Sequence, residues 1–424
     1  MKPALAFAGK RYAVLGLART GLSVVDYLWQ SSASVTAWDD REEARALVQD
    51  KATLADPLEL DLSKYDAVVV SPGVPINTHP IAEKARAAGT ALIGDIELFA
   101  QARPELPPHK VVGITGTNGK STTTALIHHI IKTAGMPTLL GGNIGKPILG
   151  EHELEEGGVY VLELSSFQID LTQSLDCDVA ILLNITPDHL DRYDNFDAYA
   201  AAKARLFEMQ SDRNSSIIAI DDDPSRAIAS ETSGVVIQIS AGGCMDQSNW
   251  PALQGPHNAQ NAIAAMSAAR RLGINEEAIE EGLRSFTGLP HRMERVAERD
   301  GVLFVNDSKA TNPTSTAPAL AAYPAIHWIL GGRAKSNNLD ACEPYFGHVR
   351  AAYTVGETAS LFEKLLAPWM PARNCETIRK AVRIAAEAAK PGETVLLSPA
   401  CASFDQYGDF EERGDDFRAA VGSL

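Results

Sequence analysis

The sequence predicts an α/β protein of three domains, each built on a parallel sheet. Short apolar runs of strand length alternate with helix-patterned segments along the whole chain, as in sheets covered by helices. The 424 residues exceed the usual domain size of about 100–200 residues. Proline- or glycine-rich joints at 104–108 and 288–292 suggest domains at 1–98, 99–289 and 290–424. We expect a Rossmann-like first domain, a central P-loop ATPase-like domain and a Rossmann-like third domain.

Composition excludes several classes of function. The net charge of −16 argues against a general nucleic-acid binder. No apolar run approaches the length of about 18 residues that a membrane span needs. The five cysteines are scattered without a CxxC pair, which indicates a reducing cytosol and no cysteine metal site. The amino terminus has no signal-peptide core. We therefore expect a monomeric cytoplasmic protein that acts on small molecules.

The first hundred residues begin like a Rossmann fold. A strand at Tyr12–Gly16 precedes a glycine-rich turn and a helix at Leu22–Trp29, and a second strand at Ser34–Trp38 ends at Asp39. Ala18 replaces the second glycine of GxGxxG, which hinders a close approach to a pyrophosphate. A dinucleotide site and a plain α/β crossover both remain open at this point.

A mononucleotide is a further possibility for this region. The predicted strand Asp66–Val70 is followed by Ser71-Pro72-Gly73, and loops at strand ends hold ligands in such sheets. The candidate contacts are Thr20, Asp39, Arg41, Ser71 and Gly73.

The segment Gly113–Thr122 has the features of a phosphate-binding loop. A strand at Val111–Ile114 leads in and a helix at Thr122–Thr133 leads out. Backbone N–H groups converge at such a junction, and the helix dipole favours negative charge. Lys120 would reach the β- and γ-phosphates and Ser121 a Mg²⁺ ion. The strict P-loop spacing is not met, so an ordinary glycine turn is the alternative.

Two candidate metal ligands follow. Glu163 lies in the predicted strand Val159–Leu164, where a carboxylate is costly unless it is paired or binds a metal. His189 follows the predicted strand Val179–Ile185, at the kind of strand end where ligands bind. A buried hydrogen-bonded acid and a loop histidine without a role are the alternatives. A glycine-rich turn is expected at Gly141–Gly145.

Two predicted helices carry polar residues of uncertain purpose. Lys203 lies on the helix Phe196–Met209, and its residue type alone favours a solvated surface lysine. Asn258 and Asn261 precede or open the helix Ala262–Leu272 and share one helical face. Two amides on one face could read a purine edge, although capping by Asn258 is an alternative.

The last third repeats the α/β pattern. The segment Gly288–Glu294 reads as a hinge, and polar loops follow the predicted strand ends at 306–312, 331–336 and 398–407. The predicted strands are Val302–Val305, His327–Leu330, Ala351–Val355 and Thr394–Leu397.

These motifs together resemble the Mur ligase family, the ATP-dependent amide ligases of peptidoglycan precursor synthesis. The resemblance covers essentially the whole chain in order. It rests on the segments Gly116–Ser121, Gly142–Gly145, Glu163–Gln168, His189–Arg192, Lys203, His257–Asn261, Leu289–Arg292 and Asp307–Asn312. The segments Gly94–Leu98 and Ser398–Ser403, with Phe410, look like the D-glutamate-adding members. The Asp-Asn-Pro-Arg signature of the diamino-acid-adding relatives is absent.

The resemblance implies a reaction. ATP phosphorylates the carboxylate of a UDP-N-acetylmuramoyl-L-alanine substrate, and the amine of D-glutamate then displaces phosphate. The catalytic set would be Lys120, Glu163, His189 and Lys203. Two Mg²⁺ ions would be held by Ser121, Glu163, His189 and Lys203, the lysine as a carbamate.

The resemblance also implies three binding sets. ATP would be held by Gly116, Thr117, Asn118, Gly119, Lys120, Ser121, Thr122, Asn258, Asn261, Arg292 and Asp307. The UDP-substrate would be held in the first domain and its neighbour by Thr20, Asp39, Arg41, Ser71, Gly73, Asn143, Ser165 and Gln168. D-glutamate would be held in the third domain by Thr311, Lys335, Ser403 and Phe410.

Some residues depart from the family pattern, and two other functions compete. Arg333-Ala334 stands where relatives often have acidic or small residues, and Arg19 and Asp40 stand where uncharged residues are expected near the UDP. An NAD-dependent oxidoreductase would predict a complete GxGxxG and leave the P-loop idle. A non-catalytic nucleotide-binding protein would predict loss of Lys120, Glu163 or His189, and all three are present.

Overall fold

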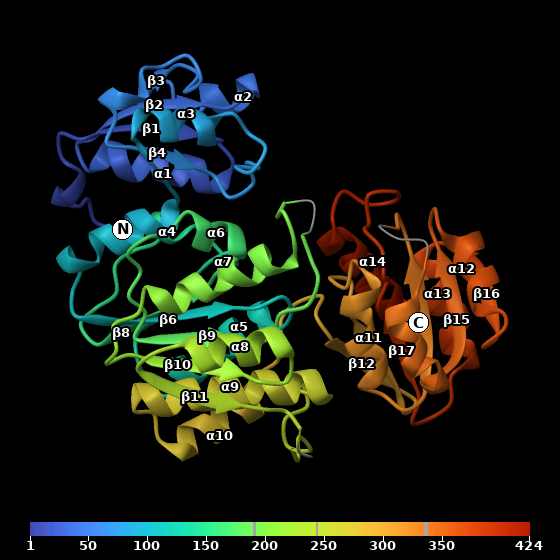
Figure 1. Cartoon of the computed structure of the whole chain (residues 1–424). Helices are drawn as coiled ribbons and strands as arrows, with labels where there is room; N and C mark the ends of the chain where they lie inside the picture. The colour runs from blue at the N-terminus through green and yellow to red at the C-terminus, as the bar shows by residue number, and fades with distance from the viewer. Residues whose placement is uncertain (190–191, 243–244, 335–337) are drawn as a thin grey trace. The chain divides into compact units, whose positions relative to one another are not determined.

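The computed structural model describes residues 1–189, 192–242, 245–334 and 338–424. Its described strands form three sheets with helices around them (Figure 1). The chain divides into two compact units. One comprises Met1–Gly242 and Ile263–Gly282, and the other Gly243–Ala262 and Leu283–Leu424.

The first sheet confirms the Rossmann-like opening. Its strands are parallel in the order β3-β2-β1-β4-β5. Side chains alternate along β1, so that Tyr12 and Val14 join the cluster of α1 while Ala13 and Leu15 join that of α3. The elements are β1 (Arg11–Leu15), α1 (Arg19–Gln30), β2 (Ser34–Trp38), α2 (Glu42–Ala46), β3 (Thr53–Leu54), β4 (Ala67–Val70), α3 (Ile81–Ala88) and β5 (Ala91–Ile93), with short 3₁₀ turns η1 (Leu5–Phe7) and η2 (Leu62–Lys64).

The second sheet is also parallel, in the order β11-β10-β9-β6-β8-β7. Gly141 and Gly142 pair with Leu162 and Glu163 at the end of β7, so the glycine-rich turn begins later than predicted. The elements are α4 (Asp95–Ala102), η3 (Arg103–Glu105), β6 (His109–Thr115), α5 (Lys120–Thr133), β7 (Thr138–Gly142), η4 (Ile148–Gly150), β8 (Gly158–Glu163), α6 (Ser166–Asp170), β9 (Val179–Leu182), α7 (Phe196–Glu208), β10 (Ser215–Ala219), α8 (Asp223–Glu231) and β11 (Val235–Ile239).

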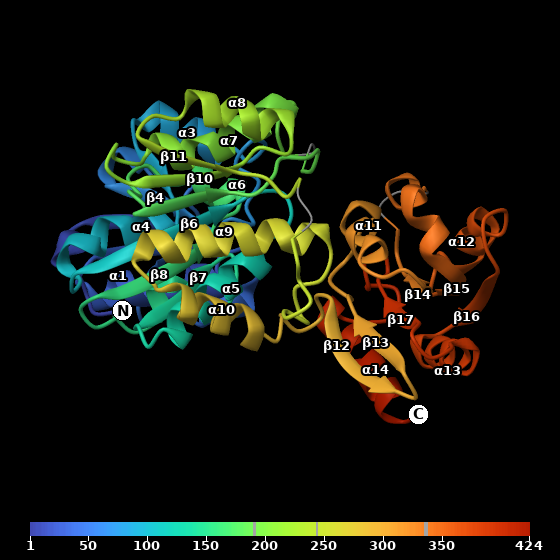
Figure 2. The same ribbon diagram turned by 90° about the horizontal axis from the view of Figure 1, so that it is seen from below.

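The third sheet is mixed, in the order β12-β13-β17-β14-β15-β16. β12 (Glu294–Arg299) runs antiparallel to β13 (Val302–Asn306), and the two strands form a hairpin (Figure 2). In the turn between them, Asp300 and Gly301 both have positive φ. Asp-Gly is a hairpin signal. The other elements are α11 (Pro313–Ala321), β14 (Ile326–Gly331), η5 (Asp340–His348), β15 (Val349–Val355), α12 (Ala359–Leu366), β16 (Ala372–Glu376), α13 (Ile378–Ala388), β17 (Thr394–Leu397) and α14 (Phe410–Gly422).

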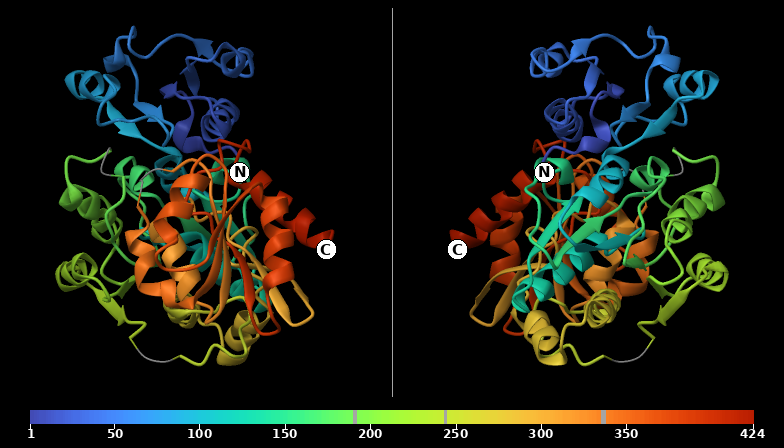
Figure 3. Two further views of the ribbon diagram at one scale, coloured as in Figure 1. Left: turned by 90° about the vertical axis from the view of Figure 1, so that its right-hand side faces the viewer. Right: turned by 90° about the vertical axis from the view of Figure 1, so that its left-hand side faces the viewer.

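Both faces of the third sheet are covered by helices (Figure 3). Trp328 and Leu330 of β14 join a buried cluster with residues of α11 and α12. Ile329, between them, joins the opposite cluster with residues of α13 and α14. This alternation explains why the strand reads as a continuous apolar run. Packing in this second cluster also holds α14 beside the loops that leave the sheet.

Two further helices are α9 (Pro256–Leu272) and α10 (Glu276–Ser285). Because Pro256 suits the first helical turn, α9 begins six residues before the predicted Ala262. No helix in the described part of the chain combines the length and the apolar composition that crossing a bilayer requires.

Candidate active site

The loop between β6 and α5 forms a glycine-dependent cradle. Gly116 and Gly119 have φ values of 150° and 84°, which favour glycine. A Cβ on Gly116 would lie 3.1 Å from the Cβ of Leu183, so the loop packs tightly on the end of the sheet. Lys120 Nζ donates to the carbonyl oxygens of Gly116, at 2.9 Å, and Thr117, at 2.8 Å. Ser121 and Thr122 follow in the first turn of α5.

Asn184 holds this cradle from the neighbouring strand end, a role that sequence analysis missed. Its Oδ1 accepts from the Asn118 N–H at 2.8 Å, and its Nδ2 donates to the Asn118 carbonyl at 3.2 Å. Its backbone carbonyl accepts from the Thr117 N–H at 2.8 Å. The available signal was its position at the carboxyl end of the predicted strand Val179–Ile185, where ligand loops gather.

Lys203 is buried, so the alternative of a solvated surface lysine is wrong. The residue is 1% exposed. Its Nζ donates to the Gly116 carbonyl at 2.9 Å and lies over the Tyr199 ring. Lys120 donates to the same carbonyl. Burial, and secondly the charge of Lys120, lower the pKa of Lys203 well below its usual value. The site therefore favours an uncharged amine.

Glu163 ends β8 with one carboxylate oxygen bound and one without a partner. Oε1 accepts from Asn143 Nδ2 at 2.8 Å, while the buried Oε2 has no hydrogen-bond partner. A Cβ on Gly142 would fall 2.1 Å from the Glu163 carbonyl oxygen, so glycine is needed there. An unsatisfied buried carboxylate oxygen is costly and suits a cation ligand.

His189 lies in a strained position near this strand end. Its φ is 53°, an uncommon value for a residue with a side chain, and its ring lies 5.0 Å from that of Phe167. Its side chain is about half exposed. Among the described residues, the structure contains no preformed group of three or more metal-binding side chains.

A cavity of about 350 Å³ brings together six of the eight predicted UDP-substrate residues. These six are Thr20, Asp39, Ser71, Gly73, Asn143 and Gln168. Arg19 also lines the cavity and adds a cation that suits a diphosphate. Ser165 and Arg41 are not among the lining residues. Ser165 Oγ accepts from the Gln168 N–H at 3.2 Å in a capping box.

Asp39 shapes the turn beside this cavity. Its Oδ2 accepts from the Leu17 N–H at 2.7 Å, and its Oδ1 forms an ion pair with Arg41 at 3.0 Å. The hydrogen bond from Arg41, helped by those from backbone N–H groups, lowers the pKa of Asp39 to about 2. Arg41 thus pairs with the Asp39 carboxylate, which in turn holds the turn through its hydrogen bond from Leu17.

The predicted adenine contacts lie in the second unit, on the first turns of α9. Asn261 Nδ2 donates to Asn258 Oδ1 at 3.1 Å, which confirms that the two amides share a face. Asn258 Nδ2 donates to the Gln254 carbonyl at 3.0 Å. Because α9 already begins at Pro256, Asn258 is within the helix and the capping alternative is wrong.

Asp307 is buried at the end of β13, close to the segment that carries Arg292. Its Oδ1 accepts from the Met293 N–H at 3.2 Å and its Oδ2 from Ser398 Oγ at 2.8 Å. Burial raises the pKa of Asp307 to about 7 against these hydrogen bonds. His291 and Met293 both have positive φ, so the segment around Arg292 is strained.

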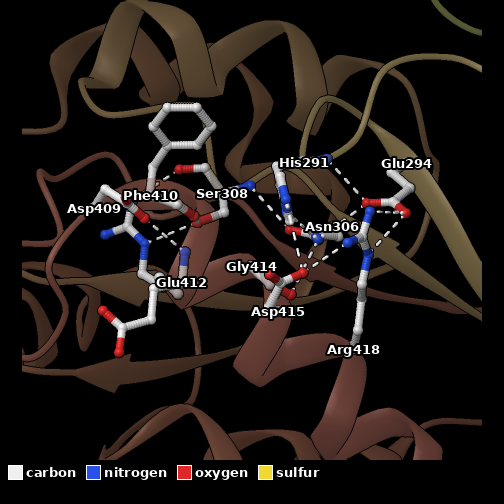
Figure 4. Close-up of polar contacts among 11 residues, drawn as sticks. His291, Glu294, Asn306, Ser308, Asp409, Phe410, Glu412, Gly414, Asp415 and Arg418 are labelled. Carbon is white, nitrogen blue, oxygen red and sulfur yellow. Dashed lines mark hydrogen bonds and ion pairs between the residues drawn. The ribbon is translucent and has the colours of Figure 1, made fainter.

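The predicted D-glutamate residues lie on loops at one edge of the third sheet. Ser403 follows β17, Thr311 follows β13, and Phe410 begins α14. Ser308 Oγ donates to the Phe410 carbonyl at 2.8 Å (Figure 4), and Lys309 Nζ lies 3.7 Å from the centre of the Phe410 ring. Lys335 lies outside the described residues.

Arg333, one of the departures from the family pattern, has its side chain paired with an exposed acid. Its backbone forms a bridge with Ala402, with N–H to carbonyl distances of 2.9 Å in both directions. Its Nε lies 3.3 Å from Glu357 Oε2. The bridge therefore joins the loop after β14 to the loop of Ser403.

Three family models match the chain in order. Residues 10–94 match the Mur ligase MurD-like N-terminal domain, residues 114–254 the Mur ligase middle domain, and residues 291–401 the Mur ligase glutamate ligase domain. The first match argues against the dinucleotide-binding alternative.

Curated relatives match over nearly their whole length. The UDP-N-acetylmuramoylalanine–D-glutamate ligase of Novosphingobium aromaticivorans is 62% identical, over 99% of this chain and 96% of the relative. The enzyme of the same name from Zymomonas mobilis is 54% identical, over 99% and 98% respectively.

Solved structures show the same fold at low identity. MurF from Acinetobacter baumannii is similar with a TM-score of 0.60 and 18% identity, over 96% of this chain and 93% of that one. The UDP-N-acetylmuramate–alanine ligase MurC from Thermotoga maritima has a TM-score of 0.58 and 16% identity, over 98% and 99%. With the cradle, the strand-end carboxylate and the three matched domains in place, the chain belongs to the Mur ligase family, on the branch with a MurD-like amino-terminal domain.

Proposed function

We propose that this chain is an ATP-dependent amide ligase that adds D-glutamate to UDP-N-acetylmuramoyl-L-alanine in peptidoglycan precursor synthesis. ATP would phosphorylate the terminal carboxylate of the UDP-substrate, and the amine of D-glutamate would attack the resulting acyl phosphate and release phosphate. The full-length similarity to relatives of that name, at 54–62% identity, supports the substrates. We place the work in the cytoplasm, where nucleotide-linked substrates are made.

The observation that carries the proposal is the pair of lysines on one carbonyl. Lys120 and Lys203 both donate to the Gly116 oxygen, at the loop where the phosphates of ATP would bind. Phosphoryl transfer depends largely on positioning and on neutralising charge. Lys120 is placed to leave the Gly116 and Thr117 carbonyls and to bind phosphate oxygens.

The residues present fit Mg²⁺, and the fit rests on the unpartnered Oε2 of Glu163. Ser121, Glu163, His189 and a carbamylated Lys203 would hold the ions, because Mg²⁺ prefers oxygen ligands. Bound Mg²⁺ would supply charge neutralisation on the transferring phosphoryl group. The carbamate would form when the uncharged Lys203 amine attacks CO₂ and loses one proton to water, and the low pKa of Lys203 favours that step.

The binding sets are assigned in the same proposal. The cavity beside Arg19 and Ser71 would take the UDP-substrate, and Asn258, Asn261, Arg292 and Asp307 would complete the ATP site. Thr311, Lys335, Ser403 and Phe410 would hold D-glutamate. We assign these tasks to the domains 1–98, 99–289 and 290–424.

Phosphate release measured against a panel of acceptors tests the proposal. We expect ADP and phosphate to appear only when ATP, Mg²⁺, UDP-N-acetylmuramoyl-L-alanine and D-glutamate are all present. L-lysine and meso-diaminopimelate should not replace D-glutamate. Equal turnover with either of them would contradict the assignment.

A further inference from the structure

A fully buried arginine connects two loops of the third sheet. Arg413 of α14 is 2% exposed. Its Nε donates to Ser308 Oγ at 3.0 Å and its Nη2 to the Ser308 carbonyl at 2.8 Å. Its Nη1 donates to the Cys401 carbonyl at 3.0 Å. One guanidinium therefore holds the loop after β13 and the loop after β17.

A third loop lies against the same group. A Cβ built on Gly332, which follows β14, would lie 3.2 Å from Arg413 Nη1 and 2.3 Å from the Ala402 carbonyl oxygen. β13, β17 and β14 are neighbours in the sheet, so the guanidinium lies at the carboxyl ends of its central strands. In parallel sheets this edge is where ligands bind.

The charge of Arg413 is only partly compensated. All of its hydrogen bonds in the described part of the chain go to neutral oxygens, and it forms no ion pair there. Burial lowers the pKa of Arg413 to about 10 and outweighs the neighbouring Cys401, Asp405, Tyr407 and Asp307, which act in the opposite direction. The side chain is thus still a cation at neutral pH. A buried cation bound only to neutral dipoles is costly unless an anion comes near.

Arg413 is absent from the predicted D-glutamate set, although its partners border that set. Ser308 Oγ bridges Arg413 Nε and the Phe410 carbonyl, and Cys401 lies two residues before Ser403. The side chain has too little exposed surface to touch a substrate itself. Its influence would act through the loops that it holds and through its field.

We propose that Arg413 is a positioning residue that makes the loop edge of the third sheet selective for an amino acid with two carboxylates. This inference rests on the proposed function, because it assigns D-glutamate to that edge. The new element is that Arg413 is a source of positive potential at the carboxyl ends of these strands. A role as a simple structural clamp is the competing explanation.

Two substitutions distinguish an effect of the positive charge of Arg413 from an effect of the hydrogen bonds by which it holds the loops. Arg413→Gln removes the charge but keeps a hydrogen-bond donor, and Arg413→Lys keeps the charge. We expect Arg413→Gln to raise the KM for D-glutamate by about tenfold or more, since charge-assisted contacts are the strong ones, with the KM for ATP within about twofold of the unaltered chain. Arg413→Lys should keep the KM for D-glutamate within about threefold of the value for the unaltered chain.

The control is Arg379→Met. Arg379, on α13, is exposed and pairs with Asp416 of α14 at 2.7 Å, so its loss should leave both KM values unchanged. Thermal unfolding checks that each variant is folded. If Arg413→Gln does not fold, Arg413→Lys decides alone, and a tenfold rise in its KM for D-glutamate overturns the inference.

The remaining outcomes are also decisive. A joint rise in the KM values for ATP and D-glutamate, or no change in either, would mean that Arg413 is only a clamp or has no role. Failure of the lysine variant to restore binding would show that charge is not what matters. If the unaltered chain releases no phosphate with D-glutamate, the proposed function fails first, and the two failures are thereby distinguished.

Discussion

At the residue scale, two lysines compete for one carbonyl oxygen. Among the described residues, Lys203 donates one hydrogen bond, to the Gly116 carbonyl, although the side chain is completely buried, and Lys120 lies nearby with a like charge. A cation in that position would also be repelled by a metal ion. A carbamate would remove the positive charge and add oxygen ligands at the end of a long side chain. The burial, more than the sequence position, makes this chemistry reasonable.

Substitution of Lys203 tests the carbamate. Lys203→Ala should lose most activity, about 10²-fold or more for a group that stabilises the transition state, and acetate at high concentration should restore part of it. Lys203→Arg should stay inactive, because guanidinium keeps its charge. Activity of both variants with and without acetate is measured, with circular dichroism as the folding control. An active Lys203→Arg enzyme would exclude the carbamate.

Asp307 predicts a pH-dependent stability with a defined sign. Burial raises the pKa of Asp307 to about 7 in the folded protein, from the ordinary value of 3.8 that applies to the unfolded chain. The native state therefore binds the proton more tightly than the unfolded state does. Stability contributed by the protonated group is present below pH 4 and is lost as pH rises towards 7. The difference corresponds to at most about 4 kcal/mol.

Denaturant unfolding at several pH values checks this. Relative to the unaltered chain, Asp307→Asn should gain stability steadily between pH 4 and pH 7. A stability difference that is constant across this range would contradict the raised pKa.

At the element scale, α14 packs closely against the segment that carries Arg292, at a position where the helix has a glycine. Asn306 Nδ2 lies 3.0 Å from His291 Nδ1 and 3.2 Å from the Gly414 carbonyl, and Arg418 pairs with Glu294 at 2.6 Å (Figure 4). A Cβ on Gly414 would fall 2.1 Å from His291 Nδ1. Glycine is therefore required here because a side chain would collide with His291, and not because the backbone turns at this position.

Gly414→Ala should destabilise the protein by about 1–3 kcal/mol through overpacking, although alanine is the better helix former by about 1 kcal/mol. The KM for ATP should rise, because His291 precedes Arg292. Gly422→Ala on the same helix is the control, since nothing lies within 4 Å of its new Cβ. Thermal unfolding and ATP kinetics measure both. Equal stability of the two variants would show that His291 moves aside freely.

At the scale of the whole molecule, the proposed reaction needs groups from both compact units. The cradle belongs to the first unit, whereas Asn258, Arg292 and Phe410 belong to the second. The attacking amine must come within about 3–3.5 Å of the acyl carbon. Ligand binding should therefore bring the units into one productive arrangement.

Small-angle scattering can test this expectation. We expect the radius of gyration to fall when an ATP analogue and the UDP-substrate are both added, and to change less with either alone. An unchanged scattering curve would argue against ligand-driven closure.

The sequence by itself determined the α/β fold class, many of the strands and the position of the cradle. The strands Ser34–Trp38 and Thr394–Leu397 are predicted to the residue, because buried parallel strands are apolar on both faces and stand out. β12 was missed because its six residues include four charged ones and none is fully buried. Its pairing at the sheet edge depends on β13 and not on its own pattern.

Only the tertiary structure decided what surrounds each polar group. Residue type could not distinguish a solvated Lys203 from a buried one, or find Asn184 and Arg413. Their roles come from contacts across 66 to 105 positions of the chain. Local sequence patterns report periodicity and turns, whereas burial and charge environment arise where distant strand ends meet. For this reason many of the elements could be predicted from the sequence, and the protonation of Lys203 and Asp307 could not.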